Sequence, residues 1–180
     1  MLIENTSIDL NGKKLLLRNA TENDAMMLID GLRQVCGETR FLLKEPEEIT
    51  LTLEEEKDFI KGNNASETNV FLIGFLDGEY VGNCSLMGKS LLRQKHRASM
   101  GIALKQQFTG LGIGTAMMEK IIALGTQMGY EQLELEVVAN NERAIHLYKK
   151  MGFEIYGTFP STMKYLDGTY ADEHWMMRKL

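Results

Sequence analysis

Three glycines at alternate positions, Gly110, Gly112 and Gly114, have the spacing with the clearest chemical meaning in this chain. They stand between an apolar run at residues 102–104 and a helical pattern that begins near Thr115. A glycine-rich turn before a helix leaves free backbone N–H groups at the positive end of the helix dipole, which suits an anion such as phosphate. The pattern therefore predicts a site for a phosphate-bearing cofactor. The plain alternative is a flexible turn in front of a helix.

Two common nucleotide-binding loops do not fit this spacing. The Walker loop requires Gly-Lys-Ser/Thr after four spacer residues, and no Lys follows Gly112 or Gly114. The dinucleotide fingerprint requires a third glycine three residues after the second, where Thr115 or Met117 stands. The spacing therefore argues against a Walker-type nucleoside triphosphatase and against a Rossmann dehydrogenase.

Length and composition predict a single domain over residues 1–180. Apolar residues at 44% and charged residues at 25% are typical of a soluble globular protein, and a net charge of −5 argues against a nucleic-acid partner. Cys36 and Cys84 are too few for a disulfide framework, and the three histidines have no metal-ligand spacing. No apolar run approaches the length of a membrane span, and no leader-like segment is present. We expect a cytoplasmic protein with no metal, membrane or nucleic-acid partner.

Turn and capping residues divide the chain into alternating strands and helices. Helices are expected to start near Thr21, at Thr52, near Thr115 and at Asn141. Seven strands are expected, at residues 13–19, 70–76, 80–87, 98–104, 132–138, 153–159 and 169–177. Since the unit from residue 98 to residue 138 reads as strand, helix, strand, it predicts a right-handed parallel crossover. The order predicts a single mixed α/β sheet with helices on both faces.

Two motifs, together with this order of strands and helices, resemble the GNAT N-acetyltransferase superfamily. Residues 108–118 look like the family's acetyl-CoA pyrophosphate loop, usually Arg/Gln-x-x-Gly-x-Gly/Ala, with Thr109 departing from the pattern at the Arg/Gln position. Residues 141–153 look like the family's Asn-x-x-Ala-x-x-x-Tyr…Gly-Phe signature. The ending, residues 167–178, is similar to the branch that holds ribosomal-protein N-terminal and spermidine acetyltransferases.

The resemblance covers nearly the whole chain and implies both a fold and a reaction. The implied fold is a single mixed, mostly antiparallel sheet of about seven strands, with about four helices on both faces and a parallel, splayed centre. The implied reaction transfers an acetyl group from acetyl-CoA to a primary amine by direct attack, without an acyl-enzyme. The acceptor is a small-molecule amine or a protein or peptide N-terminus. The alternative from another class is a catalytically silent CoA-binding sensor.

The resemblance implies that backbone groups bind most of the acetyl donor, acetyl-CoA. The end of the strand at residues 98–104 would pair with the pantetheine arm and present an N–H to the thioester oxygen. A buried core strand explains the same apolar residues. An Asn at a helix start and a Lys late in a helix also have purely structural explanations, as a cap and as a dipole partner. The implied donor-binding residues are Ile102, Ala103, Leu104, Thr109, Gly110, Leu111, Gly112, Ile113, Gly114, Thr115, Asn141, Ala144 and Lys150.

Two side chains are candidates for proton transfer. The resemblance implies Tyr148 as the general acid, because a phenol with a pKa of ~10 can protonate a thiolate whose thiol has a pKa of ~8–9. Glu136, twelve residues before Tyr148 in the sequence, is the candidate base, directly or through a water. The alternatives are a core tyrosine on an amphipathic helix and a solvated or salt-bridged glutamate.

The acceptor side is less defined by the sequence. Glu45, in an acidic stretch that also suits a solvated helix start, is a candidate for attracting a cationic amine. Ser99 stands where some family members carry a glutamate, and it is a candidate for holding a water. A homodimer is common in this branch, and nothing in the sequence establishes or excludes one.

Overall fold

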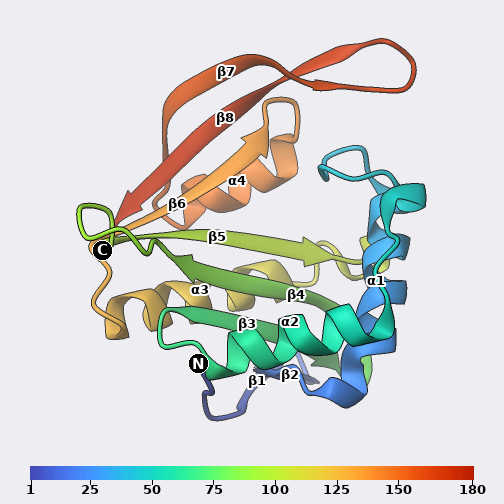
Figure 1. Ribbon diagram of the computed structural model, residues 1–180, viewed down its shortest axis with the longest axis vertical. Helices are drawn as coiled ribbons and strands as arrows, with labels where there is room; N and C mark the ends of the chain where they lie inside the picture. Colours follow the sequence, from blue (N-terminus) through green and yellow to red (C-terminus); the bar gives the residue numbers. More distant parts are fainter.

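The computed structural model describes all residues 1–180 and contains one eight-stranded sheet, in the order β1-β2-β3-β4-β5-β6-β8-β7 (Figure 1). Every neighbouring pair is antiparallel except β5 and β6. This confirms the expected mixed, mostly antiparallel sheet. The strands are β1 (Thr6–Leu10), β2 (Lys13–Asn19), β3 (Asn69–Leu76), β4 (Glu79–Gly88), β5 (Arg97–Leu104), β6 (Gln132–Val138), β7 (Glu154–Lys164) and β8 (Tyr170–Lys179).

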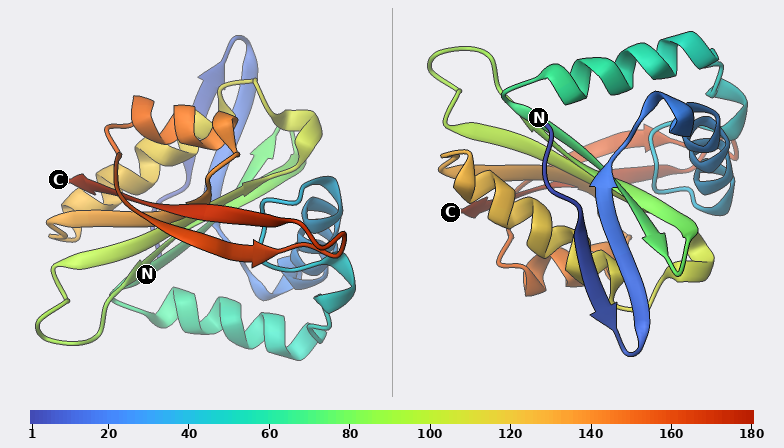
Figure 2. Two further views of the ribbon diagram at one scale, coloured as in Figure 1. Left: turned by 90° about the horizontal axis from the view of Figure 1, so that it is seen from above. Right: turned by 90° about the horizontal axis from the view of Figure 1, so that it is seen from below.

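Four α-helices cover the two faces of the sheet, two on each side (Figure 2). Helices α1 and α2 pack on one face, and α3 and α4 pack on the other. The helices are α1 (Ala25–Glu38), α2 (Leu53–Ala65), α3 (Ile113–Gln127) and α4 (Glu142–Lys150). Three short 3₁₀ turns complete the elements: η1 (Glu22–Asp24), η2 (Pro46–Glu48) and η3 (Gln106–Phe108).

Strand β1 is the element that the sequence analysis missed, so the sheet has eight strands where seven were expected. It pairs with β2 through a two-residue turn at Asn11 and Gly12, which have φ angles of 55° and 83°. Asn-Gly is the most favoured sequence for such a turn, because both positions require positive φ. The turn signal was therefore present, but the strand before it carries only two half-buried apolar residues, Ile8 and Leu10.

The predicted turn and cap residues act as expected at several element ends. Thr52 and Glu55 form a reciprocal capping box at the start of α2, with the Thr52 N–H donating to Glu55 Oε2 at 2.8 Å. Helix α3 begins at Ile113, two residues before the expected start, because the left-handed Gly112 serves as its N-cap. Strand β7 continues past the expected end at residue 159 to Lys164, so β7 and β8 form a long hairpin arm that extends beyond the helices (Figure 1).

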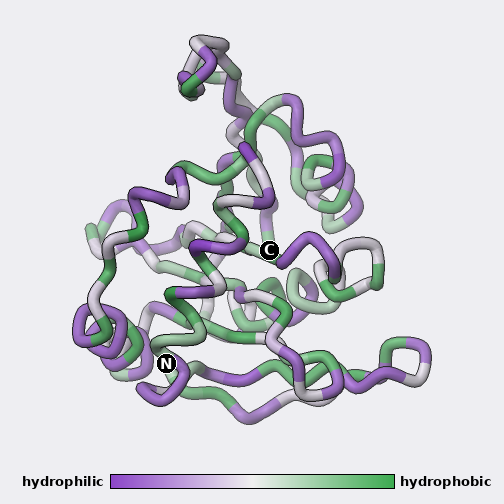
Figure 3. Tube along the Cα trace, turned by 90° about the vertical axis from the view of Figure 1, so that its right-hand side faces the viewer, coloured by the Kyte–Doolittle hydropathy of each residue, from purple (hydrophilic) through white to green (hydrophobic).

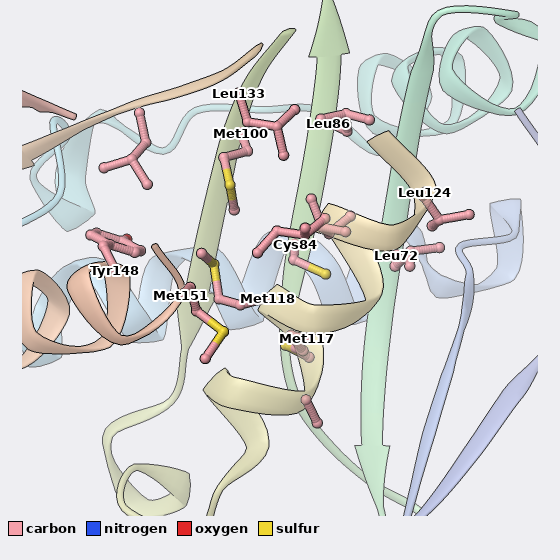
Figure 4. Close-up of a cluster of buried hydrophobic side chains, with 14 of the residues drawn as sticks. Leu72, Cys84, Leu86, Met100, Met117, Met118, Leu124, Leu133, Tyr148 and Met151 are labelled. Atoms are coloured by element: carbon pink, nitrogen blue, oxygen red, sulfur yellow. The ribbon is translucent and has the colours of Figure 1, made fainter. Parts of the chain in front are cut away.

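The main hydrophobic core lies between the sheet and α3 and α4 (Figure 4). Met117 and Met118 of α3 are fully buried against strands β3 to β6. Apolar segments concentrate in the middle of the molecule, whereas the outer helix faces and turns are largely hydrophilic (Figure 3). This packing fixes the start of α3, and with it the glycine loop, against the sheet. None of the four helices has the length and apolar character required to cross a bilayer.

Candidate active site

The sheet opens between its two parallel strands. Strands β5 and β6 pair only over Arg97–Ser99 and Gln132–Glu134, whereas β6 stays paired with β8 over its whole length. Strand β5 is paired with β4 as far as Leu104. The segment from Met100 to Leu104 therefore has a free backbone edge on the side facing β6, which can accept an extended ligand as an additional strand.

A cleft of about 580 Å³ occupies this opening. It is lined from β5 on one side, from β6 and α4 on the other, and from the end of α1 with the segment that follows it. Because the cleft passes between two strands, it connects the α1 and α2 face of the sheet with the α3 and α4 face. Its lining residues are Val35, Glu38, Thr39, Phe41, Leu42, Met100, Gly101, Ile102, Ala103, Leu104, Gln106, Thr109, Glu136, Val137, Asn141, Arg143, Ala144, Leu147 and Tyr148.

The glycine loop presents six consecutive unpaired amides. None of the backbone N–H groups of residues 110–115 has a hydrogen-bond partner, and the first paired one donates from Ala116 to the Gly112 carbonyl at 3.1 Å. Gly110 and Gly112 both have φ near +82°. Such left-handed positions turn successive N–H groups toward a common concavity, which binds anions. The geometry therefore fits the diphosphate of a CoA thioester.

Thr109, the irregular position of the loop, has a local role. Its hydroxyl donates to the Gln106 carbonyl at 2.7 Å and so closes η3 just before the loop. Its side chain also lines the cleft. An Arg or Gln at this position could donate a hydrogen bond to phosphate. Thr109 instead donates to the backbone and stabilises η3, the turn before the loop.

Tyr148 lies on α4 with its side chain directed into the cleft region (Figure 4). The residue is only 8% exposed, and its hydroxyl has no hydrogen-bond partner within the protein. Burial raises the pKa of the Tyr148 phenol to about 12. The phenol therefore remains protonated at neutral pH and is available as a proton donor.

Glu136 reaches the same cleft from β6. Its neighbours Leu135 and Val137 are buried on the opposite side of the strand, so Glu136 points toward the α1 and α2 face. It forms no ion pair, in contrast to Glu134, which lies 3.1 Å from Arg97. Burial and the negative charge of Glu136 raise the pKa of Glu173 on the neighbouring β8.

Asn141 caps the helix that carries Tyr148. Its Oδ1 accepts a hydrogen bond from the Ala144 N–H at 3.3 Å, and its own N–H donates to the Val138 carbonyl at 2.8 Å. Both Asn141 and Ala144 also line the cleft. The cap thus fixes the direction in which α4 leaves β6, and with it the position of the tyrosine two turns later.

The glycine loop, residues 110–115, borders a separate hollow beside the β1–β2 turn and does not line this cleft. Three further residues named from the sequence also lie outside the cleft. Glu45 precedes η2, and its N–H donates to Glu48 at 2.9 Å. Ser99 sits in β5 beside Glu134, at the closed end of the opening. Lys150 is exposed in the last turn of α4. The structure does not bring any of these side chains to the lining residues.

Other lining residues were not predicted as site residues from the sequence. Glu38, Thr39, Phe41 and Leu42 come from the end of α1 and the segment after it, which has neither a regular period nor a motif with a known mechanism. Arg143 adds a cation at the start of α4. These residues meet the cleft only through tertiary folding, since their neighbours in space are far away in the sequence.

Comparisons with known proteins identify the family. The profile of the acetyltransferase (GNAT) family matches residues 37–153. An L-amino acid N-acetyltransferase of Escherichia coli is 33% identical over 110 residues, which is 59% of this chain and 66% of that protein. An N-alpha-acetyltransferase of Sulfurisphaera tokodaii is 30% identical over 170 residues, 89% of each protein.

Solved structures agree with the fold. A GNAT-family acetyltransferase from Streptococcus pneumoniae superposes with a TM-score of 0.88 at 29% identity, covering 92% of this chain and 99% of that one. A putative acetyltransferase from Salmonella typhimurium, solved with its cofactor acetyl-CoA, gives a TM-score of 0.81 at 15% identity, over 92% of this chain and 94% of that one. The second likeness supports the fold alone.

The fold, the open edge of β5 and the amide-lined loop, together with these matches, define the class: this chain belongs to the GNAT family of acetyltransferases. It is an acetyl-CoA-dependent N-acetyltransferase. The enzyme reading is thereby favoured over the silent CoA-binding sensor.

Proposed function

We propose that this enzyme acetylates the α-amine of an amino acid or of a peptide N-terminus, with Glu136 as the base and Tyr148 as the acid. The observation that carries this proposal is that both side chains line one cleft from different elements, beside the free edge of β5. A base and an acid facing the same opening are what direct acyl transfer to an amine requires. Of the two relatives named above, one is named for L-amino acids as acceptors and the other for N-alpha-acetylation, and an α-amine is an acceptor compatible with both names.

Donor binding in this proposal relies on the main chain. Acetyl-CoA supplies the activated acetyl group as its thioester. The amides of residues 110–115 hold the diphosphate, and the β5 edge from Ile102 to Leu104 pairs with the pantetheine arm. Asn141 and Ala144 border the arm from the other side of the cleft.

The catalytic steps follow from the placement of the two side chains. Glu136, directly or through one water, accepts a proton from the α-ammonium group, so that the amine nitrogen can attack the carbonyl carbon. A backbone N–H at the end of β5 donates to the carbonyl oxygen as negative charge develops there, a contribution of ~3–4 kcal/mol for one well-placed donor. As the C–S bond breaks, Tyr148 donates its proton to the sulfur, and the second proton that the nitrogen loses as the amide forms returns to the tyrosinate, directly or through water. The products are an N-acetyl amine and free CoA.

The charge of the cleft supports a cationic acceptor. Glu136 is an unpaired carboxylate at the opening on the α1 and α2 face, while the amide-lined loop is on the α3 side. An ammonium group approaching from the first face meets negative charge, and the phosphates meet positive dipoles on the second. The two substrates therefore enter from opposite faces of the sheet.

An acceptor panel tests the proposal. CoA release is measured with free L-amino acids, with peptides carrying free or acetylated N-termini, with Nα-acetyl-lysine, and with polyamines. We expect turnover of the α-amine compounds and none of Nα-acetyl-lysine or of the N-terminally blocked peptides. Turnover confined to polyamines or to the lysine side chain would contradict the α-amine assignment.

A further inference from the structure

The segment from Glu38 to Leu42, which we call the strap, starts at the last residue of α1 and borders the cleft on the α1 and α2 face. Glu38, Thr39, Phe41 and Leu42 all line the cleft. Arg40 is the exception, since its side chain points away from the lining and toward the tip of the β7–β8 hairpin. The hairpin tip extends over the side of the molecule on which the segment after α1 lies (Figures 1 and 2), and the contacts of Arg40 connect the two.

One end of the strap is attached to the donor side of the cleft. Glu38 Oε2 accepts a hydrogen bond from the backbone N–H of Gln106 at 2.7 Å, and Gln34 donates to Oε1 of the same carboxylate at 2.7 Å. Gln106 opens η3, directly before the glycine loop. The start of the strap is therefore fixed to the element that leads into the donor loop.

Arg40, in the middle of the strap, contacts the tip of the β7–β8 hairpin. Its guanidinium lies 3.7 Å from the centroid of the Tyr165 ring, and its Nη2 donates to Thr169 Oγ1 at 3.1 Å. Asp167, in the same hairpin tip, lies 3.5 Å from Nη2. We call these contacts of Arg40 the clasp.

Apolar packing continues the clasp into the cleft. Phe41, the residue after Arg40, packs with Tyr165 against a small cluster of Val138, Met163 and Ala171. These residues belong to β6, β7 and β8. Phe41 also lines the cleft. Because it follows Arg40 directly in the chain, the contacts of Arg40 with the hairpin fix the position of Phe41 in the cleft wall.

The geometry distinguishes the parts of the clasp. The side chains of Arg40 and Asp167 are 49% and 56% exposed, and an ion pair of that exposure contributes little. The stacked guanidinium and its hydrogen bond to Thr169 are the directional contacts. A planar guanidinium provides both at once, and a lysine ammonium cannot reproduce the stacking.

We propose that Arg40 is a positioning residue for the acceptor amine: its clasp on the hairpin tip holds Thr39 and Phe41 against the cleft and so determines how tightly the acceptor is bound. This inference rests on the proposed function for its kinetic readout, but the clasp itself is measured without any substrate. Arg40 does not line the cleft, so it acts through the strap and not on the reacting atoms.

The test compares Arg40→Ala with wild type and with Arg93→Ala, a matched loss of an exposed arginine that has no partner. We expect Arg40→Ala to raise the acceptor KM at least fivefold, with the KM for acetyl-CoA within twofold of wild type. Arg40→Lys is expected to behave like Arg40→Ala, because the charge remains and the stack is lost. Tyr165→Leu is expected to raise the same KM, with the double variant no worse than the stronger single variant.

Hydrogen exchange provides the substrate-free measurement. In Arg40→Ala, amides of residues 39–44 and 165–169 are expected to exchange at least fivefold faster, with no change in α3. Unchanged exchange would overturn the clasp. Faster exchange with an unchanged acceptor KM, or an equal rise in both KM values, would overturn the positioning role. If the acceptor panel shows turnover only of another amine, the α-amine proposal fails, and the same comparison is made with that amine.

Discussion

Ser99 and Glu134 are the last residues at which β5 and β6 pair, and beyond them the two strands separate. The pair marks the closed end of the opening in the sheet. Everything proposed for catalysis lies past this point, since Glu136 and the free edge of β5 begin within two residues of it. The parallel pairing thus sets where the acceptor and the donor can meet.

Replacing Tyr148 by Phe removes the proton donor and keeps the ring. We expect kcat to fall at least tenfold while the dissociation constant for acetyl-CoA, measured by calorimetry, changes less than twofold, because the phenol acts when the thiolate leaves. Tyr170→Phe, at a residue 58% exposed, is the matched control and should retain full activity. Wild-type kcat in Tyr148→Phe would contradict its role as the acid.

Replacing Glu136 by Gln removes the base without changing the size of the side chain. We expect kcat/KM at pH 7 to fall about 100-fold, the lower end of the range for general base catalysis. The deficit should shrink as pH rises past the pKa of ~8 of an α-amine, since a deprotonated acceptor needs no base. The measurement is a pH–rate profile of both proteins. Glu154→Gln, the same change at an exposed position on β7, should give the wild-type profile.

Gly112→Ala tests the amide loop through its backbone. Gly112 has φ +83°, and an added Cβ meets only Leu10 at 3.9 Å, so the effect is conformational and not steric. Gly129, just after α3, has φ +79° with nothing within 4 Å and serves as the control. We expect both variants to lose about 1 kcal/mol of stability in denaturant unfolding. Only Gly112→Ala should raise the KM for acetyl-CoA, and equal KM values in the two variants would argue against the loop as the diphosphate site.

The ion pair of Arg18 with Asp24 predicts an acid-dependent loss of stability. Partial burial acts to raise the pKa of the Asp24 carboxyl, but hydrogen bonds from Arg18 and Thr21 and the Arg18 charge outweigh it and lower the pKa from 3.8 to about 2. A lowered pKa in the folded state contributes stability that is present above pH ~4 and lost as pH falls toward 2. We expect Asp24→Asn to cost about 2 kcal/mol at pH 7, and the difference from wild type to diminish between pH 4 and pH 2.

Urea unfolding at several pH values measures this difference. Asp58→Asn, at a side chain that is 79% exposed, is the matched control and should show no cost at either pH. A cost for Asp24→Asn that is the same at pH 7 and pH 2.5 would show that the carboxylate charge is not its source.

Local signals were sufficient for most of the fold. The Asp77-Gly78 turn and the Thr52–Glu55 box specify a hairpin and a helix start through contacts within a few residues. The first strand escaped because its burial is slight: Ile8 and Leu10 are only partly covered. The Asn11-Gly12 turn was a signal for a hairpin, but the strand is stabilised by pairing with β2, and its own two apolar residues do not predict a strand.

The candidate site also contains parts set by local conformation and parts set by long-range contacts. The glycine loop and the cap at Asn141 are local conformations, so their residues were readable from spacing alone. The strap could not be predicted from the sequence, because Arg40 contacts residues of a hairpin tip more than a hundred residues later in the chain. No periodicity encodes that contact. The roles of Tyr148 and Glu136 stay predictions until the variants above are measured.

The six unpaired amides of the glycine loop have a consequence for how the protein tolerates change. Every residue except proline has a backbone N–H, so binding of a ligand by these groups does not depend on the identity of the side chains. Leu111, which is 43% exposed at the loop, is therefore free to vary without altering what the loop recognises. Sequence drift at this site is limited by the backbone angles of its glycines, and donor recognition can persist while the acceptor side of the same cleft diverges.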